Sequence, residues 1–132
     1  MGSLTTNKSL VLDALDILFN KRDFETAAER WSLDYVQHSR LVPPGRDGLF
    51  GLVRSMPEGT RYEPGLAMAD GEFVMIHGRY AQPCQRALVA VDMFRINNGI
   101  LVEHWDVLQE EATIEESAGG HPMFGDQFPG TE

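Results

Sequence analysis

The second half of the chain alternates apolar and polar residues with the period of two that is typical of β-strands. Between the last two alternating runs lies Asn97-Asn98-Gly99. An Asn-Gly pair between such runs indicates a hairpin, because both residues tolerate the positive φ that the turn requires. Asp70-Gly71 predicts a further turn, and a loop is expected around Pro83. The pattern therefore predicts an antiparallel meander of four strands, at residues 60–69, 72–80, 86–96 and 100–109.

The first half of the chain has the spacing of helices. Apolar residues recur every three or four positions in residues 9–19. Asp23 can cap a second helix that extends to Trp31, and residues 32–38 are expected to add another helical turn or two. After the break at Pro43-Pro44-Gly45, residues 46–55 form a third predicted helix. Helices followed by a meander predict an α+β fold, in which the helices close one face of a curved sheet.

A single domain is expected over residues 1–132, with its core at about 9–109. Residues 110–132 form a tail rich in Gly, Glu and Pro that also contains Met123, Phe124 and Phe128. Such apolar residues predict that the tail packs on another surface, with a partner subunit as one option.

Polar groups interrupt the last two strands where a buried face is expected. Alternation places Asp92 and Phe94 on one face of the first of these strands. The residues that share one face of the second strand are Val102, His104, Asp106 and Leu108. An unpaired buried charge costs several kcal/mol, roughly, so carboxylates and an imidazole among apolar side chains predict a pocket. Desolvation raises the pKa of a carboxyl in such a pocket, which makes Asp106, with His104 beside it, the leading acid/base candidate. The alternative is a solvent-open face on which Asp106 pairs with a Lys or Arg.

The charge and composition of the chain limit the classes of partner that it is expected to bind. The chain has 20 acidic and 11 basic residues, giving a formal net charge of −9. An acidic surface without a Lys/Arg cluster repels phosphate backbones and anionic lipids, so neither nucleic acid nor a membrane is expected as a partner. No apolar run approaches the roughly 18 residues of a membrane span, and the N-terminus lacks a leader pattern. The single Cys84 forms no internal disulfide, so a cytoplasmic protein is expected.

Metal and cofactor motifs are missing from the sequence. The histidines share no short spacing of the H-x-x-x-H kind; they are His38, His77, His104 and His121. There is no G-x-G-x-x-G, no phosphate loop and no G-x-S-x-G. We therefore expect neither a metal nor a cofactor.

Two motifs resemble a known family. Y-V-Q-H lies before a Pro-Gly break, and V-D-M-F-R is followed by N-N-G-I-L-V-E-H-W-D-V-L-Q. Together with the order of helices and strands, they resemble the SnoaL-like polyketide cyclases over about residues 9–109. That family belongs to the nuclear transport factor 2-like superfamily, with ketosteroid isomerase, scytalone dehydratase and limonene epoxide hydrolase. The resemblance implies a cone-shaped barrel with a ligand cavity between the helices and the concave face of the sheet, usually in a homodimer.

The resemblance also implies roles for individual residues. Asp106 matches the acid/base Asp of the cyclases, and Asp92 matches the protonated Asp in the oxyanion hole of the isomerase. His38 falls near the general-base position of the isomerase. Arg79, in M-I-H-G-R-Y, matches the arginine of the hydrolase, but no Asp or Glu accompanies it there. That departure weakens the hydrolase interpretation.

The remaining candidates are assigned by strand face. Met75, His77 and Arg79 share a face and are expected in the pocket, where Asp92 with His77 polarises a carbonyl. For Asp92 the alternative is a buried hydrogen bond or ion pair with His77 or Arg79, and for His77 it is a purely structural role.

His38 with Tyr35 is expected at the mouth of the pocket, the alternative for His38 being a hydrogen bond at a helix end. Glu103 and Trp105 alternate onto the opposite face, where they are expected to join two subunits. Phe94, Leu108 and Met75 are expected to form the apolar wall of the pocket.

The function that these expectations favour is a cofactor-independent cyclase or isomerase. Its substrate is expected to be a hydrophobic small molecule with a carbonyl group, such as a polyketide. Two alternatives stay open: an epoxide hydrolase or dehydratase of the same fold, and a non-catalytic module that binds a small ligand or dimerises.

Overall fold

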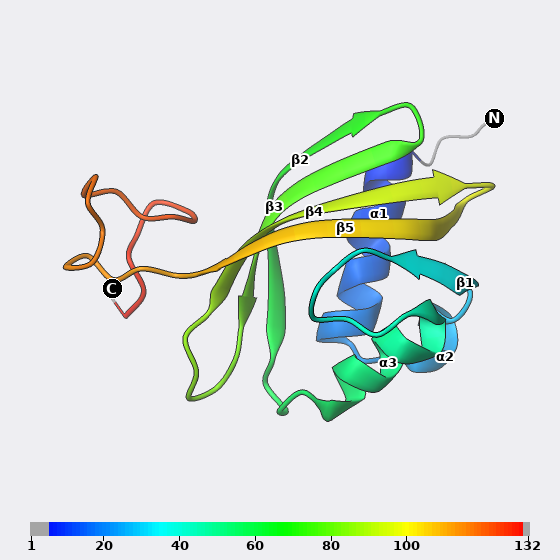
Figure 1. The fold of residues 1–132 in the computed structure, drawn as a ribbon, viewed down its shortest axis with the longest axis horizontal. Coiled ribbons are helices and arrows are strands. Elements are labelled where there is room, and N and C mark those ends of the chain that lie inside the picture. Colours follow the sequence, from blue (N-terminus) through cyan, green and yellow to red (C-terminus); the bar gives the residue numbers. More distant parts are fainter. Residues whose placement is uncertain (1–5, 131–132) are drawn as a thin grey trace.

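The computed structural model describes residues 6–130 and contains one five-stranded sheet, packed against helices on one face (Figure 1). The strand order is β1-β5-β4-β3-β2. The strands are β1 (Trp31–Gln37), β2 (Arg61–Asp70), β3 (Phe73–Ala81), β4 (Leu88–Asn97) and β5 (Ile100–Glu110). Strands β2 to β5 pair antiparallel in chain order, so the predicted meander and the α+β class are confirmed.

The hairpin between β4 and β5 has the expected chemistry. Asn98 and Gly99 have φ values of 54° and 76°, which is the left-handed region that an Asn-Gly turn favours. This turn sets which residues of β4 and β5 lie opposite each other, and therefore which side chains share a face.

The helices lie where the apolar repeats predict them, except that the second helix ends at Ala27 instead of extending to Trp31. They are α1 (Asn7–Leu15), which continues into the π-helical turn η1 (Asp16–Asn20), α2 (Phe24–Ala27) and α3 (Gly45–Ser55). The Thr6 side chain accepts a hydrogen bond from the Ser9 N–H and so caps α1. Between the helices and the sheet lies the core, whose largest fully buried side chains include Leu15, Leu18, Trp31, Ile76 and Leu101.

Residues 31–37 form a strand, which corrects the helix predicted there. β1 pairs parallel with β5, with Trp31 opposite Leu101 and Gln37 opposite His104. Trp31 and Tyr35 are both buried and lie four residues apart, a spacing that fits a helical face and a strand face equally well. A register shift between Trp31 and Val36 interrupts the alternation, which removes the period that identifies a strand.

A second irregularity interrupts the predicted alternation of β5 at Val102. Arg95 pairs with Glu103 and the next residue, Ile96, pairs with Leu101, which leaves Val102 as an extra residue in β5. Leu101 is fully buried, whereas Val102 is only partly buried. The simple alternation of inward and outward side chains is therefore broken at Val102, between Leu101 and Glu103.

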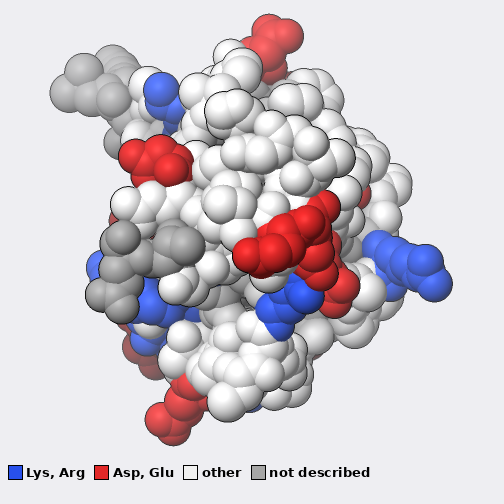
Figure 2. All heavy atoms as spheres, turned by 90° about the vertical axis from the view of Figure 1, so that its left-hand side faces the viewer, with Lys and Arg blue, Asp and Glu red and all other residues white. Residues whose placement is uncertain are grey.

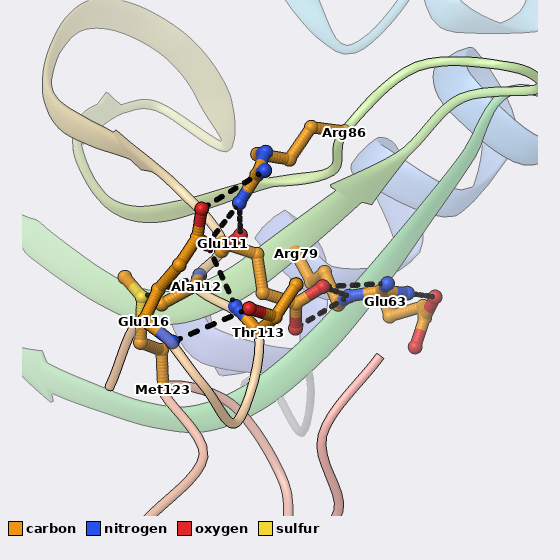
Figure 3. Close-up of polar contacts among 8 residues, drawn as sticks. All are labelled: Glu63, Arg79, Arg86, Glu111, Ala112, Thr113, Glu116 and Met123. Atoms are coloured by element: carbon orange, nitrogen blue, oxygen red, sulfur yellow. Dashed lines mark hydrogen bonds and ion pairs between the residues drawn. The ribbon is translucent and has the colours of Figure 1, made fainter. Parts of the chain in front are cut away.

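The tail packs on its own chain. Glu111 is buried, and its carboxylate accepts hydrogen bonds from Arg79 at 2.8–3.0 Å, while Arg79 also donates to Glu63 (Figure 3). Arg86 donates to the Glu111 carbonyl and pairs with Glu116. On this side of the molecule, acidic and basic side chains are mixed across a largely uncharged surface (Figure 2). Within residues 6–130, no helix has the length and apolar character needed to cross a membrane.

Candidate active site

A cavity lies between the helices and the inner face of the sheet. Its volume is about 80 Å³, measured as the space open to the centre of a water-sized sphere. One water needs roughly 10–15 Å³ by that measure, so the cavity has room for a small organic group. Its walls are mostly apolar and include Leu15, Phe19, Trp31, Leu49, Phe94 and Leu108.

Strand pairing brings four polar side chains together in this cavity. Asp92 of β4 lies directly opposite Asp106 of β5, and His104 lies opposite Phe94. On the other side of β5, Gln37 of β1 pairs with His104. All four polar residues line the cavity, so the expected convergence of Asp92, His104 and Asp106 is present, and Gln37 joins it.

A continuous chain of hydrogen bonds connects Gln37, His104 and Asp92 with Tyr80. The Gln37 Oε1 accepts from the Ser39 backbone N–H at 3.0 Å and lies 2.6 Å from His104 Nδ1. His104 Nε2 lies 2.7 Å from Asp92 Oδ1, and the Tyr80 hydroxyl donates to Asp92 Oδ2 at 2.8 Å. Asp92 and His104 are 1% and 7% exposed, so these contacts are shielded from water and are strong.

Asp106 differs from Asp92 because it is only partly buried. Desolvation raises the pKa of its carboxyl above the usual 3.8, while a hydrogen bond from Ser39 and the charge of His104 act in the opposite direction. The neighbouring Asp92 raises the pKa further. A carboxyl with a raised pKa at a cavity wall is suited to taking up and returning a proton.

Two tyrosines supply neutral hydroxyls. Burial raises the pKa of Tyr35 and of Tyr80 well above the usual range, so both remain protonated. Tyr35 lies nearly parallel to the His104 ring at a centroid distance of 6.3 Å, and Phe94 lies 5.0 Å from the same ring. These contacts restrict the orientation of the imidazole.

Gln37 is the functional candidate that the sequence patterns left unassigned. Its oxygen is engaged twice, whereas its Nε2 is shielded from solvent and has no hydrogen-bond partner among residues 6–130. Buried polar atoms are almost always paired, so an unpaired donor at a cavity wall indicates a place where a ligand atom can bind.

Three predicted pocket residues on β3 lie on the opposite face of the sheet. Met75 is exposed, and His77 packs beside Phe124 of the tail at a ring distance of 5.6 Å. Arg79 binds Glu63 and Glu111 (Figure 3). It is not among the residues that line the cavity. Because apolar Val74 and Ile76 occupy the inner face, the alternation of the strand turns Met75, His77 and Arg79 outward.

His38 is also absent from the cavity lining. Its Nε2 lies 2.7 Å from Glu103, and its ring stacks on Trp105 at 4.8 Å. The hydrogen bond from His38, followed by that from Arg95, holds the pKa of Glu103 below its usual value. His38 thus lies with Glu103 and Trp105 on the outer face, while Tyr35, two residues before Gln37, lines the cavity.

The cavity also contains the one group of potential metal ligands found among the described residues. Ligand atoms of Asp92, His104 and Asp106 lie within 4.8 Å of one another. However, His104 and Asp92 already bind each other at 2.7 Å, so their nearest donor atoms are occupied. The hydrogen bond between His104 and Asp92 accounts for two of the three residues in this cluster.

The chain matches known proteins in both sequence and fold. The sequence model of the family described as SnoaL-like domain matches residues 11–104. A comparison with curated protein sequences found no match. Among solved structures, the chain is similar to a candidate ketosteroid isomerase from Kribbella flavida, with 18% identity, 92% of this chain and 94% of that chain covered, and a TM-score of 0.74.

Two similar structures are described as candidate polyketide cyclases. A SnoaL-like candidate polyketide cyclase from Shewanella putrefaciens has 15% identity, with 80% of this chain and 91% of that chain covered and a TM-score of 0.65. IdmH from Streptomyces antibioticus, a candidate polyketide cyclase, has 20% identity, covers 80% of this chain and 93% of its own, and has a TM-score of 0.64. These likenesses establish a nuclear transport factor 2-like fold.

Proposed function

Because the chain belongs to the family of SnoaL-like domains, we propose that it is a cofactor-independent cyclase or isomerase. Its substrate is a hydrophobic small molecule with a carbonyl group, such as a polyketide, and the reaction proceeds by acid/base chemistry. The observation that carries this proposal is the partly buried Asp106 carboxyl, whose pKa is raised by an apolar cavity of ligand size.

The reaction begins with proton removal from the carbon next to the carbonyl. Ionised Asp106 accepts this proton, and the electron pair of the C–H bond moves into an enolate whose negative charge lies on the former carbonyl oxygen. The unpaired Nε2 of Gln37 donates a hydrogen bond to that oxygen, which lowers the barrier because the charge develops in a water-poor site.

The enolate then has two outcomes. In a cyclase, its carbon attacks a second carbonyl of the same molecule, a C–C bond forms, and the proton held by Asp106 passes to the new alkoxide. In an isomerase, the same proton returns to a different carbon. Neither outcome consumes an oxidant or a co-reactant, so the residues of the cavity suffice.

Asp92 takes a supporting role in this mechanism rather than the expected role in an oxyanion hole. Its two oxygens are engaged by His104 and Tyr80, so donating to a ligand requires that one of these bonds be broken. We therefore assign Asp92 to holding the His104 ring and balancing its charge. Phe94 and Leu108 form part of the apolar wall of the cavity.

The position of Arg79 separates the two alternative activities, epoxide hydrolysis and dehydration. An epoxide hydrolase of this fold needs an arginine between two carboxylates inside the cavity. Arg79 does lie between two carboxylates, those of Glu63 and Glu111, but none of these three residues lines the cavity. A dehydratase needs only an acid/base pair, which His104 with Asp92 or Asp106 supplies. Dehydration is therefore the second candidate activity.

The test compares the small-molecule extracts of the source organism carrying wild-type protein and Asp106→Asn. Asp34→Asn, an exposed carboxylate on β1, is the matched control. Loss of one product and accumulation of a species of equal mass, in Asp106→Asn only, supports cyclisation or isomerisation. A mass difference of one water supports the dehydratase, and unchanged extracts from a folded variant overturn the catalytic proposal in favour of a binding module.

A further inference from the structure

The orientation of the Gln37 carboxamide is fixed by a donor that cannot reverse. The Ser39 backbone N–H only donates, and it points at the Gln37 side chain at 3.0 Å. The atom that faces it must therefore be the carbonyl oxygen. A flipped amide would set an NH₂ group against the Ser39 N–H, with two donors facing each other.

This orientation determines the protonation of His104. The same Gln37 oxygen lies 2.6 Å from Nδ1, and an amide oxygen only accepts, so Nδ1 carries a hydrogen. Nε2 lies 2.7 Å from Asp92 Oδ1, a distance at which a bare nitrogen lone pair and a carboxylate repel each other. A second proton must therefore lie in the Nε2–Oδ1 contact.

We infer that Gln37 is a positioning residue, which keeps Nδ1 of His104 protonated so that the exchangeable proton of the His104–Asp92 pair lies at Nε2. With that proton, the pair has no net charge. Asp106 is then the one carboxyl of this cluster whose charge is not balanced within it. The catalytic use of this arrangement rests on the proposed function: the neutral His104–Asp92 pair leaves Asp106 as the carboxylate that acts as base.

The groups facing His104 come from every strand that lines this part of the cavity. Asp92 lies on β4 and Asp106 on β5 itself, with ligand atoms of all three within 4.8 Å. Tyr80 of β3 binds Asp92, and Tyr35 of β1 lies along the imidazole ring. Both tyrosines are neutral, so the two carboxyls are the charged groups that act on the ring.

The experiment is long-range ¹H–¹⁵N correlation NMR of the histidine side chains in ¹⁵N-labelled, ligand-free protein. The resonances of His104 are identified by their loss in His104→Gln. Gln37→Met removes the amide oxygen at similar length, Gln37→Glu keeps an acceptor oxygen there, and Gln109→Met makes the same exchange at an exposed glutamine of β5.

In the wild type, in Gln37→Glu and in Gln109→Met, Nδ1 of His104 is expected to have the shift of a protonated nitrogen. In Gln37→Met, Nδ1 is expected to lose its proton, leaving the ring protonated at Nε2 toward Asp92. An unprotonated Nδ1 in the wild type, or an unchanged spectrum in Gln37→Met, overturns the inference.

A second variant keeps the inference testable if Gln37→Met does not fold. In Asp92→Asn, with Gln37 intact, we expect a neutral ring protonated at Nδ1, and a ring protonated only at Nε2 overturns the inference. Neither spectrum requires turnover. Failure of the extract comparison therefore leaves this result standing, and failure here leaves Asp106 as the proposed base.

Discussion

Replacing Asp92 by Ala tests the hydrogen-bond chain through the stability of the fold. Asp92 is 1% exposed, and its two oxygens accept from His104 Nε2 and the Tyr80 hydroxyl. Alanine removes both acceptors and leaves two donors in a site closed to water. Each unsatisfied buried donor costs about 1–3 kcal/mol, and breaking a buried charged pair costs about 3–5 kcal/mol. We therefore expect the free energy of unfolding to fall by about 3–5 kcal/mol.

Urea denaturation followed by tryptophan fluorescence measures this loss, because Trp31 is buried in the core and becomes exposed on unfolding. With a slope of about 2 kcal/mol per molar urea, the midpoint shifts by roughly 2 M. Asp34→Ala, on an exposed position of β1, is the control and should stay within about 0.5 kcal/mol of wild type. A loss below about 1 kcal/mol in Asp92→Ala would contradict this expectation, since His104 and Tyr80 would then have other partners.

Three further substitutions test other parts of the structure. Because the pKa of Asp106 is raised in the folded state, its ionisation destabilises the fold as the pH rises above the usual 3.8. In urea titrations, Asp106→Asn should therefore gain stability relative to wild type between pH 3 and pH 7. A difference that stays flat or falls over this range contradicts the prediction. A Cβ on Gly78 would overlap the Tyr62 ring, so Gly78→Ala should lose about 1–3 kcal/mol in thermal unfolding, whereas Gly51→Ala, which meets no atom within 4 Å, should not lose stability. We expect Trp105 on the outer face to join two subunits, so Trp105→Glu should turn a dimer into a monomer by light scattering, and an unchanged mass contradicts the interface.

The part of the fold set by short-range chemistry could be predicted from the sequence. Alternation and the turn at Asn98-Gly99 located β4 and β5, and that register brought Asp92, His104 and Asp106 to one face. β1 could not be predicted in this way, because the four-residue spacing of Trp31 and Tyr35 fits a helix as well as a strand. Its partner strand, β5, lies about 70 residues away in the chain, and no local pattern indicates that pairing.

The errors within the candidate site have related causes. On β3, Met75, His77 and Arg79 do share one face, as predicted. Buried Val74 and Ile76 show that the inner face is the other one. Because β1 was not predicted as a strand, His38 was wrongly expected at the pocket and Gln37 was left unassigned. A strand that places Tyr35 and Gln37 inward places His38 outward. The role of Gln37 depends on the Ser39 backbone N–H, which has no signature in the sequence.

The proposed mechanism requires that burial at the cavity wall raises the pKa of the Asp106 carboxyl. A ¹³C NMR titration of aspartate carboxyl carbons measures this in the ligand-free protein, with the Asp106 resonance identified by its loss in Asp106→Asn and exposed Asp34 as the internal reference. We expect Asp106 to titrate at a higher pH than Asp34 and above the usual value of 3.8. A midpoint at or below that of Asp34 would contradict the proposed acid/base role.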